Sequence, residues 1–349
     1  MKVWIDICHT PQFNFFKPLI DELAAKGYEV YVTVLDRGKT PKIVRVELAG
    51  LEHVEVEVIG KHHMTKWSAI WDANIIRIYK LIKWARGKNI DVAISTNIFT
   101  PLVGKLFGIR SYAFGDDPQV FDFHPKGWWA TKAHMCIYEW TMSKKPPKHT
   151  EVLHCLKEWA YLAPNVFTPN HQVLEKYGVK PKEYIFLREV SVGTINYASQ
   201  APQAILAVKD LIAKLNMKVL FSLEEKHRRN EYPEDWILLQ EPIEDIHSLI
   251  YYAAGLVSSG DSMAREAALL GIPAYYLGTR HSMPANLAAA KVANLQNELT
   301  MPFEKWLGEL NEKSVEERMK AQEELRKKID EEFIDINAYM MSLVEKLKE

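Results

Sequence analysis

Residues 255–273 read GLVSSGDSMAREAALLGIP, and this stretch decides the fold. It starts as a buried strand, turns at small residues, continues with a helical pattern and ends at Gly-Ile-Pro before another strand. Backbone N–H groups at the start of a helix bind phosphate, and Ser259, Gly260 and Ser262 are small enough to let a diphosphate approach them. Glu266 follows one helical turn later, where a carboxylate can accept both hydroxyls of a ribose. The stretch therefore predicts a strand–turn–helix that holds a nucleotide.

A purely structural interpretation of the same residues is also open. Ser259 or Asp261 would then cap a core helix, and Glu266 would be a solvated carboxylate. The spacing Glu266-x-x-x-x-Gly271-x-Pro273 after a Ser/Gly turn favours the binding interpretation. It resembles the pattern with which GT-B glycosyltransferases and non-hydrolysing UDP-N-acetylglucosamine 2-epimerases hold their nucleotide.

Strands alternate with helices on both sides of this stretch. Thr40-Pro41 and Thr100-Pro101 are each predicted as an N-cap followed by proline at the first helical position, and a longer helix is expected over 68–86. Such alternation is typical of α/β proteins with parallel sheets. The expected strands are 3–7, 28–35, 53–59, 91–95 and 111–114 in the first half, and 184–189, 218–222, 236–240, 255–258 and 272–277 in the second.

The length of 349 residues fits two domains of ordinary size. The alternation breaks over 121–163, an aromatic-rich, lysine-bearing insert, and Phe167-Thr168-Pro169-Asn170 marks the expected crossing into a second domain. We expect an N-terminal Rossmann-like, acceptor-side domain over 1–166 and a Rossmann-like, nucleotide-sugar-binding domain over 167–313. Residues 314–349 are expected to form one long helix that packs back on the first domain.

The composition excludes several classes of protein. Lys and Arg number 44 against 45 Asp and Glu, so the net charge of −1 gives no global field for nucleic acid. Cys8, Cys136 and Cys155 are dispersed, so neither a disulfide framework nor a zinc site has its spacing. No apolar run is long enough to span a membrane, which leaves peripheral membrane contact open. We expect a cytoplasmic protein without a bound metal or other cofactor.

Several further stretches resemble the GT-B-like family known as domain of unknown function 354. The resemblance implies GT-B architecture, with two facing Rossmann-like domains, a cleft for a nucleotide-sugar and a C-terminal helix that crosses back; it leaves the reaction open. The stretches are residues 3–7 (VWIDI), 15–19 (FFKPL), 156–162 (LKEWAYL), 167–170 (FTPN), 187–191 (LREVS) and 246–253 (IHSLIYYA).

The chain also departs from that family at two places. Gln12 stands where the family commonly carries a His, and His9 lies three residues earlier. After the strand that ends at Arg188 the family tends to have a Trp followed by a His-Asp pair. In this chain residues 192–197 read VGTINY, with Asn196 and Tyr197 at the end of the stretch. An acid–base pair is therefore missing from the second place.

Four other residues are candidates for a site. His9 follows the first strand and is suited to deprotonate an acceptor hydroxyl, or it is a loop histidine bonded to nearby backbone. Asp116, in Gly-Asp-Asp-Pro, lies where related epimerases place a catalytic carboxylate, or it only forms a turn. Arg188 is predicted either to bind a diphosphate or to pair with Glu189 or an acid of the other domain. Ile243 is predicted to present backbone to the nucleobase, or to pack in a loop.

The stretch 124–149 holds five lysines and one glutamate, with three tryptophans among them. It is predicted either to form a lid or hairpin packed on the first domain, or to form an acceptor-side surface for a lipid-linked or anionic substrate.

Three function hypotheses follow. The first is a metal-independent glycosyltransferase that binds a nucleotide-sugar donor, expected to be UDP-linked, and an unidentified acceptor; helix N–H groups and Arg188 would stabilise the departing diphosphate. The second is an isomerase similar to the 2-epimerases, which needs acid–base groups on both faces of the sugar. The third is a non-catalytic nucleotide-sugar-binding protein, which Gln12 and Asn196 suggest.

Overall fold

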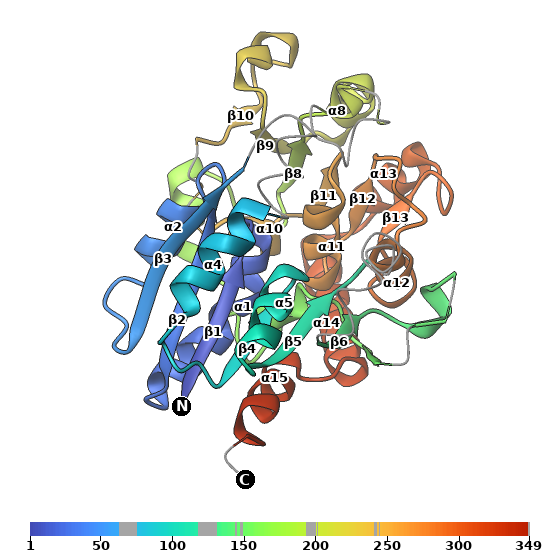
Figure 1. Cartoon of the computed structure of the whole chain (residues 1–349). Coiled ribbons are helices and arrows are strands. Elements are labelled where there is room, and N and C mark those ends of the chain that lie inside the picture. The colour runs from blue at the N-terminus through green and yellow to red at the C-terminus, as the bar shows by residue number, and fades with distance from the viewer. Residues whose placement is uncertain are drawn as a thin grey trace. The chain divides into compact units, whose positions relative to one another are not determined.

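The chain folds into two compact units, each built around one parallel sheet (Figure 1). The first unit comprises Met1–Tyr161 and Ile334–Glu349, and the second comprises Leu162–Phe333. This computed structural model describes residues 1–62, 75–117, 131–143, 145–146, 149–192, 200, 202–240, 243 and 245–347. The prediction of an α/β chain with two parallel sheets is confirmed. None of the helices described combines the length and the hydropathy that crossing a bilayer requires.

The sheet of the first unit has seven strands in the order β3-β2-β1-β4-β5-β6-β7, and all neighbours are parallel. Its central strands are apolar runs that are buried on both faces, as expected for a parallel sheet covered by helices. The strands are β1 Lys2–Ile7, β2 Glu29–Asp36, β3 Val54–Lys61, β4 Val92–Ser95, β5 Arg110–Gly115, β6 Lys132–Cys136 and β7 Thr150–Leu153.

Helices connect these strands, and two of them begin differently from the prediction. The side chain of Asn97, not Thr100, accepts the first N–H groups of α5, from Phe99 at 2.9 Å and from Thr100 at 3.0 Å. Thr40 is the first residue of α2 rather than its N-cap. Both threonine hydroxyls bond to other elements instead, Thr100 to Asp6 and Thr40 to Thr10. The helices are α1 Thr10–Ala25, α2 Thr40–Glu47, α4 Arg77–Ala85, α5 Phe99–Leu106, α7 Trp159–Leu162 and the 3-10 turn η3 Glu139–Thr141. Of the helix expected over 68–86, residues 68–74 lie outside the described part.

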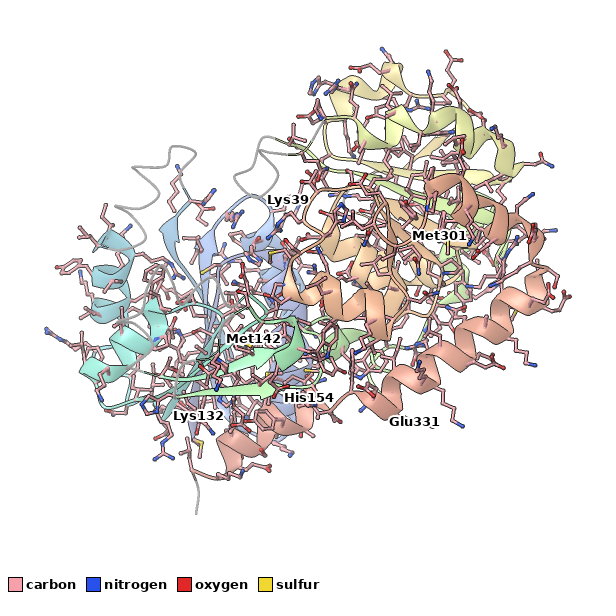
Figure 2. All side chains as sticks on the ribbon, turned by 90° about the vertical axis from the view of Figure 1, so that its right-hand side faces the viewer. Lys39, Lys132, Met142, His154, Met301 and Glu331 are labelled. Atoms are coloured by element: carbon pink, nitrogen blue, oxygen red, sulfur yellow. The ribbon has the colours of Figure 1, made fainter. Side chains whose placement is uncertain are left out.

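The stretch expected as an insert, residues 121–163, belongs to the sheet where the structure describes it. Two more parallel strands, β6 and β7, extend the sheet, so this stretch is not a hairpin. Figure 2 labels Lys132 at the start of β6 and His154 just beyond the end of β7, at opposite ends of this pair of strands. The sequence pattern misleads because a histidine stands in the middle of β6, where His134 is buried and stacks on Phe114. Residues 118–130 lie outside the described part.

The sheet of the second unit has six strands in the order β10-β9-β8-β11-β12-β13, again with parallel neighbours. Apolar side chains from its strands and from α13 form one buried cluster that includes Leu187, Phe221, Val257, Tyr275 and Trp306. The strands are β8 Tyr184–Glu189, β9 Lys218–Leu223, β10 Ile237–Leu238, β11 Gly255–Ser258, β12 Ala274–Tyr276 and β13 Gln296–Asn297. The α-helices are α8 Ala204–Ala207, α9 Lys209–Ile212, α10 Ile246–Tyr251, α11 Asp261–Leu269, α12 Pro284–Val292, α13 Phe303–Glu312 and α14 Val315–Glu332; the 3-10 turns are η4 His171–Tyr177, η6 Ala213–Leu215 and η7 Lys226–Glu231.

The C-terminal segment forms two helices rather than the single helix predicted. A capping box between Ser314 and Glu317 starts α14, and the Asp335 side chain accepts N–H groups that start α15 (Ile336–Glu345). The break lies between them because Asp335 offers the backbone a new cap. α14 belongs to the second unit and α15 to the first, where Asn337 donates to the Ala160 carbonyl at 2.7 Å. The prediction that the chain crosses back to the first unit is confirmed.

Candidate functional site

Each sheet has one point where the direction of the strand order reverses. In the first sheet this switch point lies between β1 and β4, and in the second between β8 and β11. Open parallel sheets bind ligands outside the carboxyl ends of the strands at such points, because the connections diverge there and leave a crevice. The predicted residues His9, Arg188 and Ser259 lie at the ends of β1, β8 and β11, so the topology puts them at the edges where ligands are expected.

In the second unit, small residues join the ends of β8 and β11. The Ser259 hydroxyl accepts the N–H of Val190 at 2.9 Å, and the Ser258 hydroxyl accepts the N–H of Gly260 at 3.0 Å. Gly260 is the N-cap residue of α11 and, as a glycine, it has no side chain to make a cap hydrogen bond. The first turn of α11 therefore lies at the switch point behind an N-cap residue that offers its N–H groups no side-chain oxygen.

Asp261 does not cap this helix, because its carboxylate pairs with arginines. The carboxylate oxygen Oδ2 lies 2.9 Å from Nη1 of Arg280 and 3.6 Å from Nη1 of Arg265. Arg265 is buried and also donates to the Asn286 side chain at 2.6 Å, and its other terminal nitrogen lies 3.5 Å from the Ser262 hydroxyl. Neither arginine was predicted from the sequence. Their signal was weak, since Arg265 looks like an ordinary helix residue and Arg280 is distant in sequence.

Glu266 lies inside the unit rather than on a solvated helix surface. Only 8% of the residue is exposed, and its Oε1 is 3.5 Å from Nε2 of His247 on α10. The His247 ring in turn packs edge-on against Phe167. The interpretation of Glu266 as a solvated carboxylate is therefore wrong, because its carboxylate is buried on α11.

Gly271, five residues later, has a packing role. Its φ of +79° is in the left-handed region, and a Cβ there would lie 2.6 Å from the carbonyl oxygen of Gln322 on α14. The Gly-x-Pro part of the motif thus ends α11 and lets α14 approach.

Arg188 extends from β8 toward β9, on the side away from β11. Its guanidinium donates to the Ser222 hydroxyl at 2.7 Å and forms an ion pair with Glu224. The predicted pairing partner Glu189 is replaced by Glu224 because Glu189 points into the core. Ile243, between β10 and α10, is half-buried.

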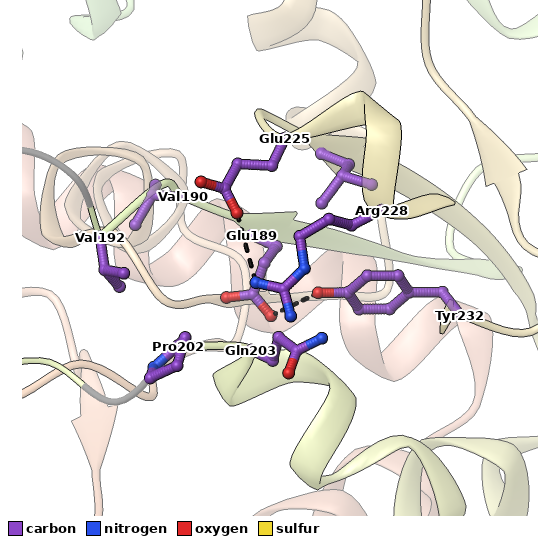
Figure 3. Close-up of a pocket in the computed structure, with 9 residues that line it drawn as sticks. Glu189, Val190, Val192, Pro202, Gln203, Glu225, Arg228 and Tyr232 are labelled. Carbon is purple, nitrogen blue, oxygen red and sulfur yellow. Dashed lines mark hydrogen bonds and ion pairs between the residues drawn. The ribbon is translucent and has the colours of Figure 1, made fainter. Parts of the chain in front are cut away.

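Glu189 lines a small cavity beside the end of β8 (Figure 3). Its carboxylate accepts the N–H of Ile205 at 2.8 Å and the hydroxyl of Tyr232 at 3.2 Å. The cavity measures about 10 Å³, which is room for about one water molecule. Burial raises the pKa of Glu189, although the hydrogen bond from Ser259 opposes this. A buried carboxyl group with a raised pKa therefore lies next to the predicted phosphate turn.

In the first unit, the end of β1 carries a buried ion pair. Asp6 is fully buried, and Arg77 donates to its two oxygens at 2.7 and 3.1 Å, while Asn97 donates at 2.7 Å. Burial alone would raise the pKa of Asp6, but the Arg77 charge and hydrogen bonds from Arg77, Thr33 and Asn97 outweigh it and lower that pKa. This network holds the loop ends of β1 and β4 in one arrangement. Arg77 and Asn97 were not predicted.

His9 occupies the N-cap position of α1. Its Nδ1 is buried and has no hydrogen-bond partner within the described part of the chain. Burial, with the positive charges of Lys157 and Arg37, lowers the pKa of His9 to about 4, and Asp116 opposes the shift. The imidazole is therefore neutral at neutral pH and able to accept a proton.

Asp116 lies near His9 and forms an ion pair with Lys157 at 2.9 Å. The carboxyl ends of β1, β2 and β5 and the segment after β7 thus bring together His9, Arg37, Asp116 and Lys157. His9 and Asp116 were predicted from the sequence, and the two cations were not. Lys157 nevertheless falls in one of the stretches that resemble the family.

Gln12 has a structural role in the same loop. Its side-chain oxygen accepts the N–H of Cys8 at 2.7 Å and so fixes the turn that precedes α1. Burial raises the pKa of the Cys8 thiol to about 11, so this thiol stays protonated. Asn196 lies outside the described residues. Within the described part no group of three or more His, Cys, Asp or Glu side chains is placed to hold a metal ion.

Comparison with known proteins agrees with this architecture. The family model described as "Protein of unknown function (DUF354)" matches residues 1–112, which confirms the resemblance over that part. A search of curated protein sequences finds no match. Spinosyn forosaminyltransferase SpnP is 14% identical over 100% of both chains, with a TM-score of 0.68, and the glycosyltransferase VinC in complex with dTDP is 12% identical over 100% of both, with a TM-score of 0.67.

The UDP-GlcNAc 2-epimerase from Methanocaldococcus jannaschii is 12% identical over 90% of this chain and 93% of that one, with a TM-score of 0.63. At these identities the likeness shows the fold alone. The chain thus shares the GT-B fold of glycosyltransferases and epimerases.

Proposed function

We propose that this chain is a nucleotide-sugar-dependent glycosyltransferase that needs no metal and binds its donor in the unit Leu162–Phe333. The observation that carries the proposal is the start of α11, which follows the glycine N-cap Gly260 at the switch point of the second sheet. A helix N-terminus of this kind favours a phosphate group. The buried Arg265 and the partly buried Arg280 beside it add positive charge at the same turn.

The donor is assigned to this turn part by part. The diphosphate binds Ser259, Gly260 and Ser262, and the ribose hydroxyls bind Glu266, one helical turn further on. Arg188 reaches a phosphate by exchanging its partner Glu224, and the backbone at Ile243 receives the nucleobase. The expected donor is UDP-linked; the dTDP bound to VinC makes a thymidine diphosphate sugar the next to test.

The unit Met1–Tyr161 with Ile334–Glu349 supplies the acceptor side. The acceptor hydroxyl attacks the anomeric carbon, the bond from that carbon to the diphosphate oxygen breaks, and the neutral His9 takes the hydroxyl proton. Asp116, paired with Lys157, stabilises the imidazolium that forms. Charge that develops on the leaving diphosphate is stabilised by the α11 N–H groups, so no metal is required. A lipid-linked acceptor and a cytoplasmic location remain predictions.

An isomerase similar to the 2-epimerases is the second candidate. Glu189 favours it, because a buried carboxyl with a raised pKa is suited to donate a proton near the bound sugar and would replace the missing His-Asp pair. The third candidate is a non-catalytic nucleotide-sugar-binding protein. It is supported by Gln12, whose side-chain oxygen accepts a hydrogen bond from the Cys8 N–H.

A product assay separates the three functions. The protein is incubated with UDP-, dTDP-, GDP- and CMP-sugars, with and without a lipid extract as acceptor source and with a chelator throughout. A transferase releases free nucleotide and does so faster with acceptor. A new sugar on an intact nucleotide would establish the isomerase, and binding without any turnover would establish the sensor; either result overturns the proposal.

A further inference from the structure

One segment of the first unit is strongly basic in a chain that is almost neutral. Residues 75–110 contain one acidic residue, Asp91, against seven basic residues, and the whole chain has a net charge of −1. Two of the seven are used internally, Arg77 by Asp6 and Lys88 by Glu55. The others are exposed: Lys80, Lys83, Arg86, Lys105 and Arg110. Lys80, Lys83, Arg86 and Arg110 make no ion pair with any described residue, so their charge faces solvent.

Large apolar side chains are exposed in the same segment. Tyr79 is 67% exposed on α4, and Leu106 and Phe107 at the end of α5 are 68% and 38% exposed. Single exposed apolar side chains are ordinary, but a group of them rimmed by cations is typical of an interaction site.

These side chains belong to neighbouring elements. α4 and α5 pack together through Leu81, Ala85 and Val103, and lie next to each other on the sheet (Figure 1). Each runs antiparallel to the strands, so both end at the edge where β4 and β5 begin. We define the basic–apolar face as Tyr79, Lys83, Arg86, Leu106, Phe107 and Arg110.

A polar groove continues this face. Its volume is about 490 Å³, and Arg110, Ser111, Tyr112 and Thr131 line it together with Lys105 and Lys132. The Ser111 and Thr131 hydroxyls already donate to the backbone carbonyls of Ile109 and Ser111. The group of the groove that suits a phosphate headgroup is therefore the exposed guanidinium of Arg110.

We propose that the basic–apolar face docks on the surface of an anionic lipid bilayer. Lys83, Arg86 and Arg110 lie against the phosphate headgroups, while Leu106 and Phe107 enter the boundary between headgroups and acyl chains. Charge complementarity selects this partner, and the exposed apolar tip distinguishes it from a purely polyanionic one such as RNA. This docking proposal does not rest on the proposed transferase activity.

Vesicle sedimentation tests the proposal with the full chain. Vesicles of phosphatidylcholine with 30% phosphatidylglycerol are compared with vesicles of phosphatidylcholine alone. We expect binding to the anionic vesicles only, and weakening by salt. The charge variant Arg86→Gln/Arg110→Gln should bind roughly 20- to 30-fold more weakly, at about fivefold for each cation removed. Leu106→Ser/Phe107→Ser should lose most binding as well.

The matched control is Lys320→Gln/Lys327→Gln, which removes two exposed lysines from α14. It should bind as wild type does, and the thermal midpoints of all variants show that they are folded. The proposal is overturned by absence of binding to anionic vesicles, by equal binding to neutral vesicles, or by equal losses in the control. Retention of RNA by the face in place of vesicles also overturns it.

Discussion

The switch points of the two sheets are lined by different kinds of groups. At β1 and β4 the first unit uses charged side chains, with Asp6 and Arg77 paired in the interior and His9 held neutral near Asp116 and Lys157. At β8 and β11 the second unit uses small residues and the backbone of α11. The difference teaches that one fold can line its two switch points with different groups, charged side chains at one and a turn of small residues at the other. It also implies that substitutions at the two switch points change stability and binding to different extents.

The largest effect is expected at the buried pair of the first unit. Arg77→Met leaves the Asp6 carboxylate buried without its cation, so the free energy of unfolding should fall by about 3–5 kcal/mol. Arg265→Met in the second unit should cost less, roughly 1–2 kcal/mol, because Asp261 keeps Arg280. Urea unfolding measures both. Equal costs for the two variants would remove the distinction drawn between the two switch points.

The next effect is expected where α11 ends. Gly271→Ala places a Cβ against the Gln322 carbonyl oxygen in a left-handed conformation, which should cost about 2–4 kcal/mol. Gly308→Ala on α13 is the matched control, since a Cβ there meets nothing within 4 Å and should stabilise by roughly 0.5–1 kcal/mol. Thermal or urea unfolding of both variants checks the pair. A harmless Gly271→Ala would mean that the Gly-x-Pro motif is not set by the packing of α14.

An effect on nucleotide binding is expected when the charge of Glu266 is removed. Glu266→Gln keeps the volume and removes the charge, so nucleotide affinity should fall by about 1.5–3 kcal/mol, or roughly ten- to a hundredfold. The matching 2′-deoxyribonucleotide should bind the wild-type chain more weakly than the ribonucleotide does. The Glu266→Gln variant should bind the two nucleotides equally. Calorimetric titration measures both, with His9→Asn as the control from the other unit. Wild-type affinity in Glu266→Gln would leave the carboxylate without a role in binding.

The smallest effect concerns pH and the first unit. Burial lowers the pKa values of His9 and His134 to about 4 in the folded chain, below the ordinary 6.5. The unfolded chain therefore binds more protons between these values, and the stability contributed by each neutral imidazole is full above pH 6.5 and is lost as pH falls toward 4. Lowering the pH from 7 to 5 should cost roughly 1–2 kcal/mol for each histidine.

Urea unfolding of His134→Asn at the two pH values checks this prediction. The variant should lose less stability than wild type on acidification, by the share of one histidine. If the variant and wild type lost the same free energy of unfolding between pH 7 and pH 5, His134 would not have a lowered pKa in the folded chain.

The sequence predicts the elements whose signal is local. β8 and β11 were predicted at their observed bounds because continuous apolar runs end at polar or small residues. The phosphate turn, too, is contained in one stretch. Arg77 was missed because its partner Asp6 is 71 positions away, and the caps of α2 and α5 were mistaken because Thr40 and Thr100 bond across the fold. β6 was missed because His134 interrupts its apolar pattern and only tertiary contacts with Phe114 and Tyr339 bury it.

Hydrogen exchange, measured by mass spectrometry with and without nucleoside diphosphate, tests the central claim most directly. Backbone N–H groups that bind a phosphate should exchange more slowly when the ligand is present. The account predicts protection in peptides that cover the end of β11 and the first turn of α11, residues 258–266, and little change in peptides that cover residues 1–62. Protection confined to the first unit, or none at residues 258–266 under saturating nucleotide, would contradict it.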